Sequence, residues 1–168
     1  WTEEGRKVEG LIPEGYILYG ELIGWVSPGK PIQAHYTYNL EPGQRALYVY
    51  RVAFVNPRGV VVDLAWDQVK AFCAERGLKH VHELWRGKRG DAAGELTPNG
   101  WLDCTFYPDY GYGAVPLSPD SPCDEGVCIR SEGLIPSIWK AKSPQFLQME
   151  TKQLDRGIVA DPEDESLV

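Results

Sequence analysis

The sequence predicts an α+β domain that is rich in antiparallel strands. β-rich segments bounded by turn signals recur along the chain, one segment has helical periodicity, and there is no internal repeat. A chain of 168 residues with 43% hydrophobic residues suits one globular domain with a substantial core. No run approaches the roughly 18 apolar residues of a membrane helix. We therefore expect no membrane contact, and we also expect a monomer.

The strands are predicted from turn signals and partial alternation. Residues 16–26 (YILYGELIGWV) lie between the turn sequences PEG and SPG, and residues 45–55 (RALYVYRVAFV) read as a mostly buried strand. A short strand follows at 60–64. Two more strands are predicted at 125–130 and 137–143.

The clearest helix prediction covers Trp66 to Arg76, where apolar residues recur at helical spacing. Gly77 stands where a left-handed C-cap is expected. Residues 78–85 return to a strand pattern, and residues 86–100 are expected to form an exposed loop. A helix can start within 146–154.

We expect residues 1–150 to form the domain and residues 151–168 to be an acidic, frayed tail. The formal net charge of −7 argues mildly against extensive phosphate contact, although the DPEDES segment of the tail supplies much of it. The four cysteines form no CxxC pair, which favours free thiols in a reducing cytoplasm. His80 and His82 share a strand face, but no third metal ligand is nearby in sequence.

Four strand segments carry polar or aromatic residues that need an explanation, since burying such groups is costly. In YGELIGW, alternation places Tyr19 and Glu21 on one face, and Gly20 and Gly24 on the other. Glycine inside a strand often marks close approach by a ligand or another backbone. The alternative is an edge strand with a solvated glutamate.

In LYVYRV, Tyr48 and Tyr50 share a face, and either ring can form a platform for a base; a core or rim tyrosine is the alternative. In DEGVCIR, Glu125 opens a strand, where its carboxylate suits a hard cation or belongs to an ordinary acidic turn. In IWKAKS, Lys140 and Lys142 share a face about 7 Å apart, which favours an anion between them or a solvated face.

In this order, YGELIG, YVYRV, EGVCIR and WKAKS resemble motifs III, IIIa, IV and V of the covalent nucleotidyltransferase superfamily of DNA ligases, RNA ligases and capping enzymes. The continuation WKAKSPQFL is most similar to bacteriophage and bacterial RNA ligases. The resemblance covers residues 15–150. It implies part of an antiparallel-sheet nucleotidyltransferase domain, ATP-grasp-like, with two sheets and flanking helices around an ATP cleft.

The resemblance also implies roles for the motif residues. Glu21 would hydrogen-bond the ribose, Gly24 would keep its strand close-packed, and Tyr50 would lie against adenine. It implies a reaction centre of three catalytic residues, Glu125, Lys140 and Lys142. Glu125 would support the metal and the lysine-adenylate chemistry, and the two lysines would contact the phosphates.

The implied reaction uses ATP with Mg²⁺ or Mn²⁺ and joins RNA or DNA ends. A lysine attacks the α-phosphate to form lysyl-AMP, AMP passes to a 5′-phosphate, and a 3′-hydroxyl then displaces it. Such a protein would work in the cytoplasm of a bacterium or a phage-infected host.

The motifs depart from the family pattern in two places. Arg51 stands where an acidic residue commonly follows the motif IIIa aromatic, which leaves its role open, although alternation turns it away from Tyr50. Arg130 replaces the lysine that often ends motif IV, and it keeps the charge with a different geometry.

Motif I, with its nucleophilic lysine, is not found. The substitute KVEG places Lys7 only 14 positions before Glu21, which is too close for the family's intervening strands and helix. With Trp1 rather than methionine at the start, we expect a truncated and inactive chain.

Other functions remain open at this point. A DNA ligase or capping enzyme usually continues into an OB-fold, whereas only 26 residues follow Lys142. A non-catalytic nucleotide- or RNA-binding module is the alternative from a different class.

Overall fold

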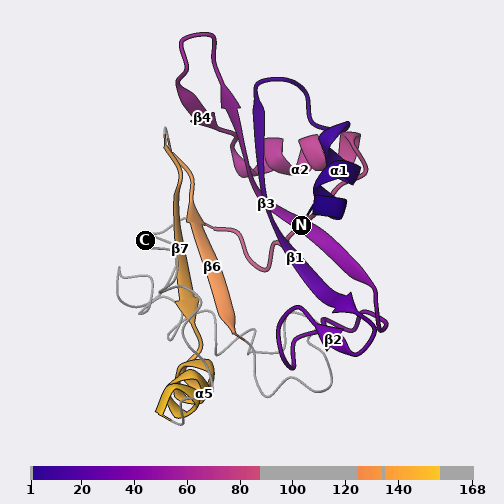
Figure 1. Cartoon of the computed structure of the whole chain (residues 1–168). Coiled ribbons are helices and arrows are strands. Elements are labelled where there is room, and N and C mark those ends of the chain that lie inside the picture. The colour runs from indigo at the N-terminus through magenta and orange to yellow at the C-terminus, as the bar shows by residue number, and fades with distance from the viewer. Residues whose placement is uncertain (1, 88–124, 134, 156–168) are drawn as a thin grey trace. The chain divides into compact units, whose positions relative to one another are not determined.

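The computed structural model describes residues 2–87, 125–133 and 135–155. These residues form an α+β structure with two sheets and three helices (Figure 1). The chain divides into two compact units, the first with residues 1–87, 116–121 and 130–138, the second with the remainder. The elements in chain order are α1 (Thr2–Glu9), β1 (Tyr16–Ser27), β2 (Lys30–Pro31), β3 (Arg45–Val55), β4 (Val61–Asp63), α2 (Trp66–Glu75), β5 (Lys79–His80), β6 (Gly126–Ser131), β7 (Ser137–Lys142) and α5 (Pro144–Asp155).

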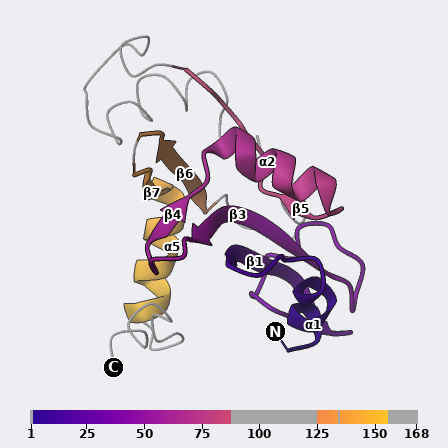
Figure 2. The same cartoon turned by 90° about the horizontal axis from the view of Figure 1, so that it is seen from above.

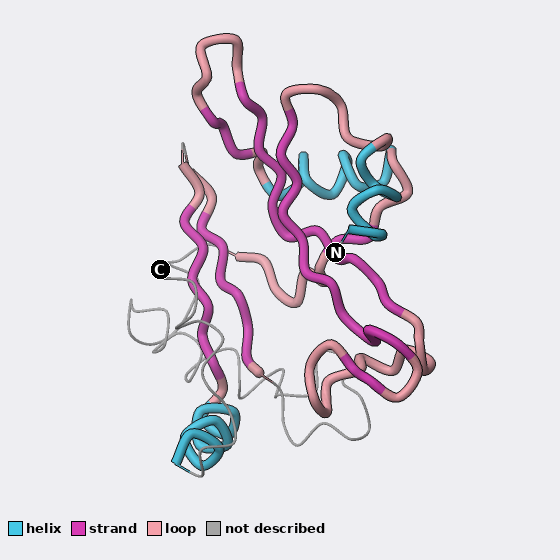
Figure 3. Tube along the Cα trace, in the orientation of Figure 1, coloured by secondary structure: helices cyan, strands magenta, loops and turns pink. Residues whose placement is uncertain are grey.

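The larger sheet has the order β2-β1-β3-β4, with β5 pairing alongside β3. All of its described pairs are antiparallel except β3 with β5, which is parallel. β1 and β3 are the two longest strands, as Figure 3 shows, and they pair from Tyr16 opposite Phe54 to Gly24 opposite Arg45. The predicted strands at 16–26 and 45–55 and the short strand at 60–64 are confirmed, as is the antiparallel α+β class in its coarse form.

The core of the first unit lies between β3 and α2. Val49 and Val52 on β3 are fully buried, and Val69, Phe72 and Cys73 on α2 are at most 6% exposed. The helix runs alongside β3 in Figure 2. Because burying such side chains is favourable by about 1.5–3 kcal/mol each, this cluster holds the helix on the sheet.

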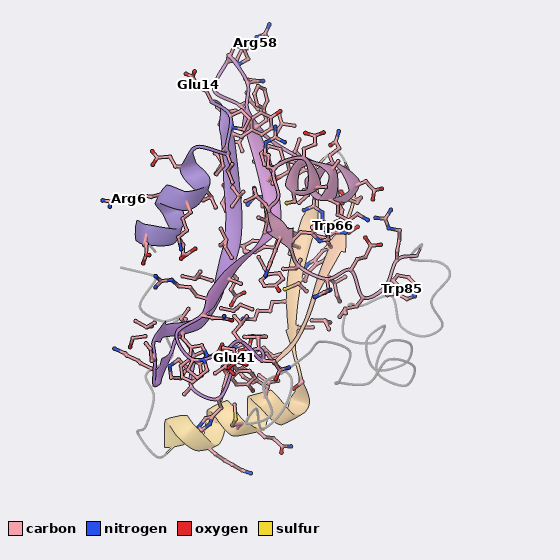
Figure 4. The ribbon with its side chains drawn as sticks, turned by 90° about the vertical axis from the view of Figure 1, so that its right-hand side faces the viewer. Arg6, Glu14, Glu41, Arg58, Trp66 and Trp85 are labelled. Carbon is pink, nitrogen blue, oxygen red and sulfur yellow. The ribbon has the colours of Figure 1, made fainter. Side chains whose placement is uncertain are left out.

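The helix α2 begins and ends where the sequence predicts. The Gln68 side chain accepts a hydrogen bond from the Ala65 amide at 2.9 Å, and the Glu132 carboxylate accepts one from the Trp66 amide at 2.7 Å. A carboxylate at this end is favourable because unpaired amides and the helix dipole meet there. Gly77 has φ +64°, so it ends the helix in the left-handed conformation. Figure 4 shows Trp66 at the start of this helix.

Three features of the first unit differ from the sequence prediction. The strand expected over residues 78–85 is only the two-residue β5, because the described pairing with β3 is limited to Tyr48 and Val49. The helix α1 and the short β2 were not predicted. Of the loop expected at 86–100, only residues 86 and 87 lie in the described part.

The second unit contains most of β6 and β7, which form a two-stranded sheet, together with α5. The Ser143 amide donates to the Glu125 carbonyl at 2.8 Å, so the end of β7 lies beside the start of β6, as in an antiparallel hairpin. The strands predicted at 125–130 and 137–143 and the helix near 146–154 are confirmed. α5 continues to Asp155, past the domain end expected at 150.

No helix in the described parts of the chain is long and apolar enough to cross a membrane.

Candidate functional site

The first unit carries Glu21, Gly24 and Tyr50 on the neighbouring strands β1 and β3. Glu21 is exposed and pairs across the strands with Tyr48. Paired residues of neighbouring strands point to the same side of a sheet, so the carboxylate and the Tyr48 ring share one face. The structure therefore places Glu21 on the same face as Tyr48, whereas the sequence assigns Tyr50 to the base; the predicted roles of Glu21 and Tyr50 stay predictions.

Gly24 lies at a close approach of two backbones. Its φ is +101°, and a Cβ at this position would lie 2.5 Å from the Gln44 carbonyl oxygen and 2.7 Å from Cδ1 of Leu40. The next amide, that of Trp25, donates to the same Gln44 oxygen at 2.9 Å. Only glycine fits here. The close approach is to the Gln44 backbone and the Leu40 side chain, and the role that the resemblance implies for Gly24 stays a prediction.

Tyr50 is the extra residue of a β-bulge. On β1, Tyr19 and Gly20 are consecutive, but their partners on β3 are Arg51 and Val49, so Tyr50 faces no residue of β1. Its side chain is 40% exposed although its neighbour Val49 is fully buried. Bulges redirect side chains and are frequent beside active sites. The aromatic residue predicted to meet adenine is therefore displayed by a local irregularity of the strand.

The bulge interrupts the alternation on which the expectation that Arg51 faces away from Tyr50 was based. Arg51 pairs with Tyr19 and Tyr48 pairs with Glu21, so Arg51 and Tyr48 lie on one face of the sheet. The Arg51 guanidinium lies 4.5 Å from the centre of the Tyr19 ring. Alternation fails at this position because one extra residue inverts the side of every residue that follows it.

Arg51 also forms an ion pair with Asp63 on β4. Its Nε and Nη2 donate to the two carboxylate oxygens at 2.5 and 3.1 Å. The hydrogen bonds to Asp63 are the main cause that raises the pKa of Arg51, so the guanidinium stays charged. The sequence did not predict this pair, since nothing in the local pattern shows that β4 lies beside β3 in this register.

In the second unit, Glu125 immediately precedes β6 and is half-buried. The following Gly126 has φ +138°, and a Cβ there would lie 2.0 Å from the Ala141 carbonyl oxygen. The glycine lets the backbone of β6 press against β7, which brings Glu125 beside the end of the strand that carries Lys140 and Lys142. Within this unit the three residues predicted for the reaction centre come from one hairpin.

The two lysines of β7 differ in their surroundings. Lys140 is exposed, whereas the Lys142 side chain is only 19% exposed and its Nζ lies 3.0 and 3.1 Å from the two carboxylate oxygens of Glu150 on α5. The sequence analysis offered an anion between the two lysines as one explanation. For Lys142, the chain itself supplies a negative group, the Glu150 carboxylate. The sequence did not predict Glu150 as a partner.

The helix that supplies Glu150 is fixed directly after Lys142. The buried Ser143 side chain accepts a hydrogen bond from the Phe146 amide at 3.1 Å, and Ala141 and Phe146 are less than 10% exposed. A serine N-cap followed by proline is a common start of a helix. This cap explains why the WKAKSP sequence places a helix at the end of the strand.

The rival lysine, Lys7, lies on the exposed helix α1. Its Nζ donates to Glu4 at 2.6 Å, and its side chain is 59% exposed. The hydrogen bond from Lys7 is the main cause that lowers the pKa of Glu4, with Arg45 adding to it. An open depression lies here, bounded by α1 and the start of β3, and it contains none of the predicted site residues.

A second charged cluster joins α2 to the segment after β5. Arg86 donates to both carboxylate oxygens of Asp67, at 2.9 and 2.7 Å, and also to Glu83, which Lys70 contacts at 2.8 Å. Arg86 is the main cause that lowers the pKa of Asp67 and that of Glu83, the latter to about 2. These groups are already paired with one another. We assign the cluster to the stability of the unit.

The described residues contain no group of three or more His, Cys, Asp or Glu side chains placed to hold a metal ion. His80 packs edge-on against the Trp66 ring at 5.6 Å, and its Nδ1 lies 2.7 Å from the Val81 carbonyl oxygen. Cys73 is a buried free thiol and Cys128 is exposed, while Cys104 and Cys123 lie outside the described residues.

Comparison with known proteins assigns the chain to a family. A search of curated proteins finds no match. A family model described as RNA ligase matches residues 1–142, which include Glu21, Tyr50 and Glu125 and extend to Lys142. The match spans most of the chain and indicates a ligase-type function. The chain belongs to the RNA ligase family.

Proposed function

We propose that this chain is the nucleotide-binding part of an ATP-dependent RNA ligase that works through nucleotidyl transfer. The observation that carries the proposal is the bulge in β3, which leaves Tyr50 40% exposed beside the strand that bears Glu21. A bulge in the middle of a long strand has a cost, so its place in a predicted nucleotide motif supports a functional origin.

The first unit would bind the adenosine. Tyr50 offers an exposed ring for stacking on adenine, which is worth about 1–3 kcal/mol per base in proteins that stack nucleobases. Glu21 is an exposed hydrogen-bond acceptor on the neighbouring strand and suits a ribose hydroxyl. Gly24 would contribute by fixing the strand rather than by touching the ligand.

The second unit would bind the phosphates and the metal. Lys140 is exposed and Lys142 can exchange its internal carboxylate partner for a phosphate oxygen. The half-buried Glu125 carboxylate fits Mg²⁺ or Mn²⁺, which prefer oxygen ligands and usually keep several waters. A bound divalent cation would offset negative charge that develops on the phosphate oxygens.

The lysine nucleophile would lie outside these 168 residues. Lys7 does not suit the task, because it lies on an exposed helix and forms ion pairs with Glu3 and Glu4 of that same helix. In the proposed reaction a lysine amine attacks the α-phosphorus of ATP, the bond to pyrophosphate breaks, and lysyl-AMP forms. AMP then passes to a 5′-phosphate end, and the 3′-hydroxyl of a second RNA end displaces it.

Calorimetry of ATP binding to this chain in the presence of Mg²⁺ tests the nucleotide site. Lys140→Ala should weaken binding about tenfold, because a charge-assisted contact to phosphate is lost. Lys152→Ala is the matched control, since Lys152 is an exposed lysine on α5 that takes no part in the proposed site, and it should leave binding unchanged. Equal affinities for both variants and the parent would contradict the proposal.

Mass spectrometry separates the enzyme from a non-catalytic nucleotide- or RNA-binding module. The product of the full reading frame, incubated with ATP and Mg²⁺, should gain the mass of one AMP on a lysine outside residues 1–168. Binding without any adduct would favour the module, and an adduct on Lys7 would overturn the assignment of the nucleophile.

A further inference from the structure

The bulge that exposes Tyr50 interrupts the strand pairing, so other contacts must stabilise it. An extra residue interrupts the ladder between two strands and leaves its own backbone without a cross-strand partner. The rest of β3 pairs regularly with β1 on both sides, from Tyr16 opposite Phe54 down to Gly24 opposite Arg45. The interruption is thus confined to one position, and side chains beside it are the natural source of its stability.

Arg51, the next residue along β3, contacts both neighbouring strands at this position. Its guanidinium forms the two hydrogen bonds with Asp63 of β4 and lies 4.5 Å from the ring centre of Tyr19 on β1. One side chain therefore links three strands across the irregular position. Because Arg51 directly follows Tyr50 in β3, contacts that hold Arg51 in place also restrict the backbone at Tyr50.

The ion pair is well suited to hold a fixed geometry. The side chains of Arg51 and Asp63 are only 32% and 11% exposed, so water screens the pair less than it screens a fully exposed one. The guanidinium fork matches the carboxylate with two parallel hydrogen bonds and also stacks on the tyrosine, which a lysine cannot reproduce. A mobile surface pair would not constrain the backbone in this way.

We propose that Arg51 is a positioning residue: through Asp63 and Tyr19 it fixes the bulge in β3 and thereby sets the orientation of Tyr50 toward the nucleobase. The inference rests on the proposed function, because it assigns Tyr50 to the base. It also gives Arg51, whose role the sequence left open, a task that needs no contact with the ligand.

Two ligands distinguish positioning from direct contact. ATP carries the base and the phosphates, whereas inorganic tripolyphosphate carries the phosphates alone. Arg51→Gln should weaken ATP binding about five- to tenfold, because a misdirected ring loses most of its stacking on the base. It should leave tripolyphosphate binding within about twofold. If both ligands lost affinity equally, Arg51 would touch phosphate itself and the proposal would fail.

The same measurement on further variants traces the path of the effect. Asp63→Asn should reproduce the loss of Arg51→Gln, and the double variant should lose no more than either single one, because the two residues act as one unit. Arg51→Lys should not restore ATP affinity. Arg86→Gln is the matched control, since it breaks another two-bond pair with an aspartate, Asp67, away from the bulge, and it should bind ATP normally.

Tyr50→Ala separates the failure of this inference from the failure of the proposed function. If Tyr50→Ala binds ATP like the parent, Tyr50 is not the base platform and the proposed function loses its main support. If Tyr50→Ala weakens binding, Arg51→Gln in that background should add nothing. A further loss in that background would show that Arg51 acts elsewhere and would overturn the inference alone.

Discussion

Two glycines determine the local backbone shape of the candidate site. Gly24 and Gly126 both have positive φ, and at both a Cβ would meet the backbone of a neighbouring segment. The first is where β1 leaves β3 and the second is where β6 meets β7. These positions need glycine for a steric reason that can be measured separately from any role in binding.

Gly24→Ala should lower the free energy of unfolding by about 2–4 kcal/mol, because the methyl group adds a clash with the Gln44 carbonyl to a strained φ. Gly29→Ala is the control: Gly29 has φ +81° but nothing within 4 Å of its Cβ position, so only the backbone strain of about 1–2 kcal/mol applies. Urea unfolding monitored by circular dichroism measures both. Equal losses would mean that the close approach is not rigid.

The role of Lys142 can be tested by changing its partner Glu150 and leaving Lys142 itself in place. Glu150 holds its ammonium group, and a phosphate would have to compete with that carboxylate. Glu150→Gln should therefore tighten tripolyphosphate binding about two- to fivefold, which corresponds to the worth of a partly exposed ion pair. Calorimetry at low ionic strength is the measurement.

Glu75→Gln controls for the change in net charge, because it removes a carboxylate from a different ion pair, that with Arg76. It should leave tripolyphosphate binding unchanged. An unchanged affinity in Glu150→Gln would indicate that Lys142 serves only to hold α5 to β7.

At the scale of elements, local sequence patterns predicted the helices and strands whose signals lie within one segment. β1, β3 and α2 were predicted because alternation, helical spacing and turn residues are properties of one segment. α5 was predicted only in outline, and its start is explained by the Ser143 cap. β1 carries Glu21, and β7, which was also predicted from its local pattern, carries Lys140 and Lys142, so the placement of these residues on strands was predictable.

The bulge, α1 and the length of β5 were not predictable in this way. A bulge is a property of two paired strands, and the sequence of β3 alternates as if it were regular until its pairing with β1 is known. α1 contains a glycine and many charges, and the ion pairs of Glu3 and Glu4 with Arg45 of β3 support it. Such contacts between distant segments are invisible in a local pattern.

At the scale of the whole molecule, the ordered motifs predicted which residues to examine but not their partners. Asp63 and Glu150, which hold Arg51 and Lys142, come from segments without any motif. The sequence shows an acidic chain of net charge −7, and the structure shows that many of its described cations are already matched by carboxylates. The proposed phosphate binding would therefore depend on a few local contacts rather than on a basic surface.

The same matched charges should make the stability of the chain depend on acid pH. Arg86 lowers the pKa of Asp67 and also that of Glu83, the latter from 4.5 to about 2. A carboxyl group with a lowered pKa in the folded state stabilises the fold above its unfolded pKa, and this contribution is lost as the pH falls through the folded value. The free energy of unfolding should thus decrease from pH 4.5 toward pH 2.

Urea unfolding at a series of pH values tests this, and two controls identify the source. Glu83→Gln should flatten the dependence, because the amide cannot be protonated in this range, and 0.5 M NaCl (on the order of a 4 Å screening length) should reduce it, since Asp67 and Arg86 are exposed. An unchanged slope in Glu83→Gln would place the acid sensitivity in other carboxylates. In that case the Arg86 cluster would not be what ties α2 to the segment after β5.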